Sequence, residues 1–125
     1  MEPILIKGTP KTPEVRFDSN EGLLEIKGRS SPENSPEFYR PLANWIQEYA
    51  QSPRDRTVIN IHLEYFNTSS SKCLLDLFKK LEAIYKSSHD VLVNWYYDED
   101  ESMLEAGEDY KVMTHIPFNM IESVD

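Results

Sequence analysis

The residues with the greatest capacity for chemistry form a short polar segment near the middle of the chain, Asn67-Thr68-Ser69-Ser70-Ser71-Lys72. Its consecutive hydroxyl groups could accept a phosphate from a protein kinase, which would add about −1.5 to −2 charges at pH 7. The same residue types are the preferred N-caps of helices, because their side-chain oxygens accept free backbone N–H groups. The two roles are compatible, so the segment predicts a capping turn and a candidate modification site. A phosphate-binding P-loop is not indicated, because its glycines are absent.

Other groups with catalytic or metal-binding chemistry are scattered. The acidic run Asp98 to Glu101 could hold a cation, but it lacks the spacing of an EF-hand loop, and acidic residues at a helix start commonly offset the helix dipole. His62, His89 and His115 fall on three separate elements with no paired ligand spacing. Cys73 has no histidine placed beside it to make a nucleophile. We therefore predict no catalytic residue, no metal site and no cofactor.

The elements on either side place the polar segment at a strand-to-helix turn. Thr57 to Phe66 is the strongest strand pattern, and its nearly continuous β-branched and aromatic residues are typical of a strand covered on both faces. A second buried-type strand, Val91 to Tyr97, ends just before Asp98. Because parallel strands end at one edge of a sheet, we expect Thr68 and Asp98 to share that edge. The start of a helix also favours an anion there.

The helices are predicted from apolar residues spaced three and four apart. The helix after the polar segment has the stripe Leu74, Leu77, Phe78, Leu81 and Tyr85, and an earlier helix has Phe38, Leu42, Trp45, Ile46 and Tyr49. The earlier helix begins either at Pro36, capped by Asn34 or Ser35, or at Pro41, which interrupts the pattern. A third, weaker helix with Met103, Leu104 and Tyr110 follows the acidic run.

The remaining strands are short. Ile4 to Ile6 reads as an edge segment, Glu14 to Phe17 and Leu24 to Lys27 as a hairpin, and Phe118 to Ile121 as a final strand. Strands that alternate with helices imply parallel pairing through right-handed crossovers. The fold class is therefore α/β, a mixed sheet with an N-terminal antiparallel hairpin, parallel strands and about three helices, in one domain covering residues 1–125.

Bulk composition narrows the function classes. The 125 residues carry 22 acidic and 13 basic side chains, a net charge of −9, which disfavours nucleic acid and anionic membrane surfaces as partners. The single cysteine cannot form an internal disulfide. No stretch approaches the ~20 apolar residues of a membrane span, and the start lacks the pattern of a secretory signal. These features predict a cytoplasmic protein.

The polar segment also resembles the SiaC family of bacterial regulatory phosphoproteins, in which an aromatic-ended strand leads into an Asn-Thr-Ser-Ser turn. The segment that carries the resemblance is Glu64-Tyr65-Phe66-Asn67-Thr68-Ser69-Ser70-Ser71-Lys72. Further similarities follow in order along the whole chain: Gly8-Thr9, Thr12-Pro13, Ser31-Pro32-Glu33-Asn34-Ser35, Trp45, Trp95-Tyr96-Tyr97-Asp98 and Pro117-Phe118.

The resemblance implies a fold similar to the STAS-like anti-sigma factor antagonist domain. It implies that Thr68, rather than a neighbouring serine, is phosphorylated by a dedicated kinase, and that a PP2C-type phosphatase removes the phosphate. The unphosphorylated form would bind and activate a diguanylate cyclase, which places the chain in c-di-GMP signalling. We expect partner contacts at Asn67, Ser69, Ser70 and Lys72. Two alternatives stay open: a STAS-like module that binds a small ligand or an anti-sigma kinase, and a small hydrolase or transferase.

Overall fold

The computed structural model describes residues 1–123, in which six strands form one sheet and three helices connect its second half. In chain order the elements are β1 (Ile4–Ile6), β2 (Glu14–Asp18), β3 (Leu23–Ser30), α1 (Ser35–Tyr49), β4 (Arg56–Phe66), α2 (Thr68–Lys86), β5 (Asp90–Tyr97), α3 (Glu101–Thr114) and β6 (Phe118–Glu122). The strands lie side by side in that same order. Pairing is antiparallel from β1 to β3 and parallel from β3 to β6, which confirms the predicted mixed α/β sheet.

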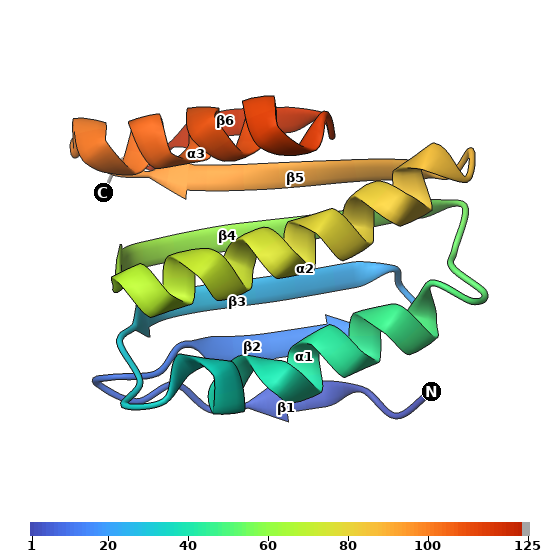
Figure 1. Cartoon of the computed structure of the whole chain (residues 1–125), viewed down its shortest axis with the longest axis horizontal. Helices are drawn as coiled ribbons and strands as arrows, with labels where there is room; N and C mark the ends of the chain where they lie inside the picture. The colour runs from blue at the N-terminus through green and yellow to red at the C-terminus, as the bar shows by residue number, and fades with distance from the viewer. Residues whose placement is uncertain (124–125) are drawn as a thin grey trace.

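All three helices cover one face of the sheet (Figure 1). Each crossover between parallel strands is expected to be right-handed, and the strands follow chain order, so successive helices return on the same side. The domain therefore has two layers, and the other face of the sheet is left without helices (Figure 1). Within residues 1–123, no helix is long and apolar enough to cross a membrane.

The prediction that the strand over residues 57–66 is covered on both faces is wrong. In β4, Ile59, Ile61 and Leu63 are buried under the helices, whereas the alternate residues Asn60 and His62 are only half-buried. The reason lies in the residue types, because polar residues occupy the alternate positions Asn60, His62 and Glu64. The overall density of apolar residues concealed an alternating pattern typical of a sheet with one solvated face.

α1 is one continuous helix that begins at Ser35. Its N-cap is Asn34, whose side chain accepts a hydrogen bond from the backbone N–H of Glu37 at 3.1 Å. Pro41 lies inside the helix, so the alternative start at Pro41 is wrong. The proline removes one helical hydrogen bond, but its side chain is exposed, so its ring does not disturb the buried stripe of the helix.

α3 packs against the sheet through an unusually close contact. The rings of Phe78, Trp95, Tyr110 and Phe118 pack with centroid separations of 5.0 to 6.3 Å. Gly107 faces Trp95, and a Cβ atom at this position would lie 2.5 Å from Cδ1 of the indole ring. The glycine lets the helix backbone rest on the indole ring, which also explains why this helix showed a weak apolar stripe in the sequence.

Candidate functional site

The polar segment lies where β4 passes directly into α2, at the edge where the parallel strands end (Figure 1). Only Asn67 separates the two elements. Its backbone N–H donates to the Ser30 carbonyl at 3.0 Å, and its side-chain oxygen accepts the Ser70 backbone N–H at 2.8 Å. Asn67 is therefore the N-cap, and Thr68 is the first residue of the helix, with its side chain exposed.

Beneath the turn lies a buried hydroxyl cluster made of Ser30, Ser35, Tyr39 and Ser70. Ser30 Oγ lies 2.6 Å from the Tyr39 hydroxyl and donates to Ser70 Oγ at 2.9 Å. Ser70 Oγ donates to the Ser30 carbonyl at 3.1 Å and lies 3.1 Å from Ser35 Oγ. Burial raises the pKa of Tyr39 to about 12, so its hydroxyl keeps its proton. The cluster ties the end of β3 to the starts of α1 and α2.

The structure separates the four consecutive hydroxyls of the turn by what they bind. Ser70 is fully buried in the cluster, so it supports the turn and has no surface for a partner. Ser69 is exposed, but its hydroxyl donates to Ser35 Oγ at 2.7 Å. Ser71 Oγ lies 3.0 Å from the Tyr110 hydroxyl. Among residues 1–123, the Thr68 hydroxyl has no hydrogen-bond partner.

The electrostatics of the turn favour an anion at Thr68. The first turn of α2 contains no acidic residue, so the partial positive charge at the helix start is not offset by its own side chains. Lys72, one turn further along, is exposed and makes no ion pair within the described part of the chain. By contrast, the start of α3 is capped by Asp100, whose pKa is lowered by hydrogen bonds from the Ser102 side chain and backbone.

The acidic run lies on the same edge as the turn, but its side chains contact their own neighbours there. Asp98 follows β5, which runs parallel to β4, and its Oδ1 lies 3.8 Å from His62 Nε2. In residues 1–123, no group of three or more His, Cys, Asp or Glu side chains is arranged to hold a metal ion. Thr68 and Asp98 therefore lie on the same edge of the sheet, as expected, and the described residues there form no metal-binding arrangement.

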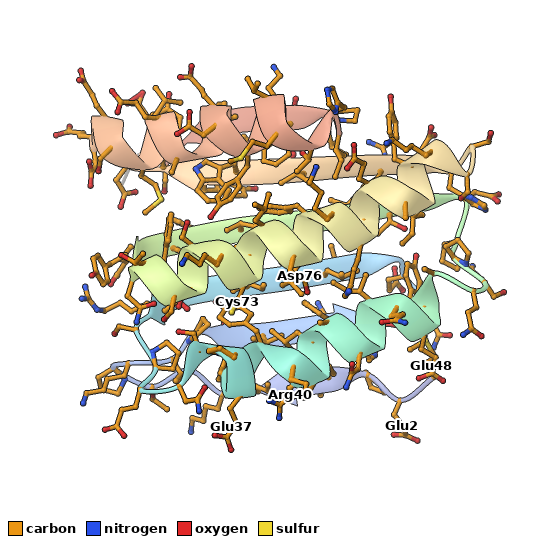
Figure 2. All side chains as sticks on the ribbon, in the orientation of Figure 1. Glu2, Glu37, Arg40, Glu48, Cys73 and Asp76 are labelled. Atoms are coloured by element: carbon orange, nitrogen blue, oxygen red, sulfur yellow. The ribbon has the colours of Figure 1, made fainter. Side chains whose placement is uncertain are left out.

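A groove of about 490 Å³ runs between α1 and α2 and begins beside the turn. Ser69, Lys72, Cys73 and Asp76 line it from α2, and Figure 2 places Cys73 and Asp76 on the part of α2 that faces α1. Burial, with a smaller contribution from Asp76, raises the pKa of the Cys73 thiol. A protonated thiol is a poor nucleophile. The groove thus offers a surface for contacts more readily than a catalytic centre.

Sequence reasoning missed Ser30, Ser35 and Tyr39 as parts of the site. Tyr39 could have been found, because the spacing 39, 42, 46 and 49 is as regular as the stripe through Phe38. Ser30 gave no signal, since it meets Ser70 only after the chain has passed through a helix and a strand. The residues expected to contact a partner divide accordingly: Ser69 and Lys72 are exposed and Asn67 is half-buried, whereas Ser70 is inside.

The fold and the turn define a class of protein, a two-layer α/β domain that presents an exposed threonine at a strand-to-helix turn. The comparison with known families then assigns the chain to one of them. The chain belongs to the SiaC family, because residues 6–123 match the family described as SiaC family regulatory phosphoprotein.

Individual relatives extend the agreement over the whole domain. An uncharacterised protein of Pseudomonas aeruginosa strain UCBPP-PA14 is 30% identical over 119 residues, which cover 94% of each chain. The solved structure of SiaC of Pseudomonas aeruginosa superposes with a TM-score of 0.91 at 28% identity, covering 98% of this chain and 100% of that one. A crystal structure of the diguanylate cyclase SiaD in complex with its activator SiaC, also from Pseudomonas aeruginosa, matches with a TM-score of 0.90 at 29% identity, covering 96% and 99%.

Proposed function

We propose that this chain is a cytoplasmic, non-enzymatic adaptor whose unphosphorylated form binds and regulates a diguanylate cyclase. A cognate kinase phosphorylates Thr68 and a PP2C-type phosphatase removes the phosphate. One observation carries the choice of residue: Thr68 is the exposed hydroxyl of the turn that makes no hydrogen bond within residues 1–123, while Ser69, Ser70 and Ser71 are each engaged. A kinase can therefore reach it without breaking the buried cluster.

The choice of partner rests on the solved relatives. The chain matches a structure in which SiaC is bound to a diguanylate cyclase, over nearly the full length of both chains. The surface that we assign to the partner begins at Asn67, Thr68 and Ser69 and continues past Lys72 along the groove between α1 and α2. This surface is contiguous with the modification site, so a phosphate on the threonine would lie within the contact area.

The switch works by obstruction rather than by unfolding. A phosphate on Thr68 adds about −1.5 to −2 charges at a helix start, where free backbone N–H groups and the helix dipole stabilise it. A cyclase surface that buries the neutral hydroxyl would instead enclose a poorly paired charge. That burial costs several kcal/mol, or about a hundredfold or more in affinity. The modified protein stays folded but no longer binds.

The assignment is tested by phosphorylation with the cognate kinase and ATP, followed by mass spectrometry of the digested chain. We expect phosphate on Thr68 in the wild type and in Ser69→Ala, and none in Thr68→Val. Binding to the cyclase is then measured by calorimetry for the modified and unmodified chain. Phosphate on a serine of the turn, or equal binding of both forms, contradicts the proposal.

A further inference from the structure

We propose that the helix-free face of the sheet holds a second binding site, for a small anion that carries a flat ring. A groove of about 740 Å³ lies on this face, within the size range of small-molecule sites. Its lining comes mostly from neighbouring strands and includes Leu5, Lys7, Glu14, Arg16, Glu25, Lys27, Asn60, His62 and Tyr96. We call this the open-face groove. The sheet face that carries this groove is the one without helices, which points away from the viewer in Figure 1.

A row of hydrogen bonds across the sheet begins in the floor of the open-face groove, at Arg16, Glu25 and Asn60, and continues beyond the groove. Arg16, Glu25, Asn60, Asn94 and Asn119 stand directly opposite one another on successive strands from β2 to β6. Arg16 donates to Glu25 Oε1 and Asn60 donates to Glu25 Oε2, both at 3.4 Å. Asn94 donates to Asn60 at 2.8 Å, and Asn119 donates to Asn94 at 3.2 Å. Polar groups held in this way are in place before a ligand arrives.

The next row supplies a pair of stacked aromatic rings. His62 of β4 and Tyr96 of β5 stack with ring centroids 5.2 Å apart and an angle of 26° between their planes. Both side chains are half-buried, and Asp98 contacts the histidine from the strand end. Because the two rings stack face to face, a planar ligand can extend the stack at an outer ring face, where offset stacking adds to the gain from burying the ring.

Charge determines the sign of the ligand. Lys7, Arg16 and Lys27 line the groove together with Glu14 and Glu25, a local excess of cations in a chain of net charge −9. Glu25 is occupied by Arg16 and by the Asn60 amide. Within residues 1–123, Lys7 and Lys27 make no ion pair, and neither does Glu14. The unpaired ammonium groups are therefore available to a carboxylate, sulfonate or phosphate.

This site is separate from the modification turn, since it is formed by the sheet face opposite the helices. It can be tested on the unmodified chain alone, by titration with benzoate followed by ¹H–¹⁵N NMR. We expect shifts at the side-chain amides of Asn60 and Asn94 and at the backbone amide of Tyr96. Benzamide, which keeps the ring but not the charge, and acetate, which keeps the charge but not the ring, should each bind about tenfold more weakly.

Two charge-neutralising variants test the location. Lys27→Gln should weaken benzoate binding about tenfold, while Lys80→Gln, a matched change in the groove between the helices, should leave it unchanged. Absence of benzoate binding, shifts confined to the helix face, or equal binding by both variants overturns the proposal. Sedimentation is measured at the same concentrations, and a dimer that Lys27→Gln dissociates would instead assign the groove to a second copy of the chain.

Discussion

At the scale of single residues, the turn has two kinds of hydroxyl with different physical roles. Thr68 faces solvent, whereas Ser70 lies at the centre of the buried cluster and contacts both Ser30 and Ser35. A buried hydrogen-bonded group contributes mostly by keeping its partners satisfied. The turn that carries Thr68 is therefore held in place by a buried hydroxyl two residues further along, Ser70.

The buried role gives a stability prediction. Ser70→Ala removes the group that Ser30 Oγ donates to and should lower the free energy of unfolding by about 1–3 kcal/mol. Urea denaturation followed by circular dichroism measures the loss. Ser69→Ala is the matched control, because its exposed hydroxyl can be replaced by water and the cost should stay below about 1 kcal/mol. Equal losses in the two variants would mean that the cluster does not stabilise the turn.

At the scale of elements, α3 is held by two contacts of different character. Gly107 sits against Trp95, and the end of the helix is joined to α2 through Glu82. The carboxylate of Glu82 is almost fully buried and lies 3.4 Å from His115 Nδ1, 3.4 Å from Lys79 Nζ and 3.5 Å from Lys86 Nζ. The first contact depends on shape and the second on charge.

The close packing of Gly107 against Trp95 predicts the effect of Gly107→Ala on stability. In an exposed helix this change would stabilise by up to about 1 kcal/mol. Here the added methyl group would lie 2.5 Å from the Trp95 ring, so helix and strand must move apart at a cost of about 1–3 kcal/mol. We expect a lower melting temperature and a changed tryptophan emission spectrum. A variant that melts at or above the wild-type temperature would show that the contact gives way easily.

The buried charge of Glu82 predicts that the stability of the fold depends on pH. Burial by itself would raise the pKa of Glu82, but the hydrogen bond from His115 and the charges of Lys79 and Lys86 outweigh it and lower the pKa below 4.5. A carboxyl with a depressed folded-state pKa stabilises the fold above its unfolded pKa, and this stabilisation is lost as the pH falls through the folded value. Chemical denaturation should therefore give Glu82→Gln a lower free energy of unfolding than wild type at pH 7. The difference should shrink as the pH falls below 4.5. A pH-independent difference would contradict this.

At the scale of the whole molecule, the two faces of the sheet are put to different uses. The helix side forms the core and presents the strand-to-helix turn with Thr68, and the helix-free side is polar and carries the open-face groove. Thr68 begins a helix that is anchored along its length, with Leu74, Leu77 and Leu81 in the core. A charge added at its first residue therefore changes the surface without disturbing the layers.

This rigidity can be tested with Thr68→Glu, which supplies one negative charge at the helix start. The charge should stabilise the helix by about 0.3–1 kcal/mol, so the melting temperature stays equal or rises slightly. Affinity for the cyclase, measured on the same samples, should fall about a hundredfold. Thr68→Val, which is neutral and similar in size, is the control and should keep most of the affinity. Unfolding of the glutamate variant would refute obstruction as the mechanism.

The amino-acid sequence by itself determined the elements and the chemistry of the turn. The alternation in β2 and β3, the helical spacing after Lys72 and the hydroxyl-rich segment around Thr68 are local patterns, and each is set by neighbours along the chain. For that reason the mixed sheet, the three helices and the strand-to-helix turn could all be predicted from residue types and their spacing.

Only the tertiary structure decided which faces are covered and which hydroxyls are free. Ser30 and Ser70 are 40 residues apart, and the row from Arg16 to Asn119 crosses five strands. Such contacts depend on strand register and on the side to which each crossover returns, and neither is encoded in a local pattern. The helix-free sheet face follows from the same cause, because three crossovers of one hand, taken in strand order, place every helix on a single side.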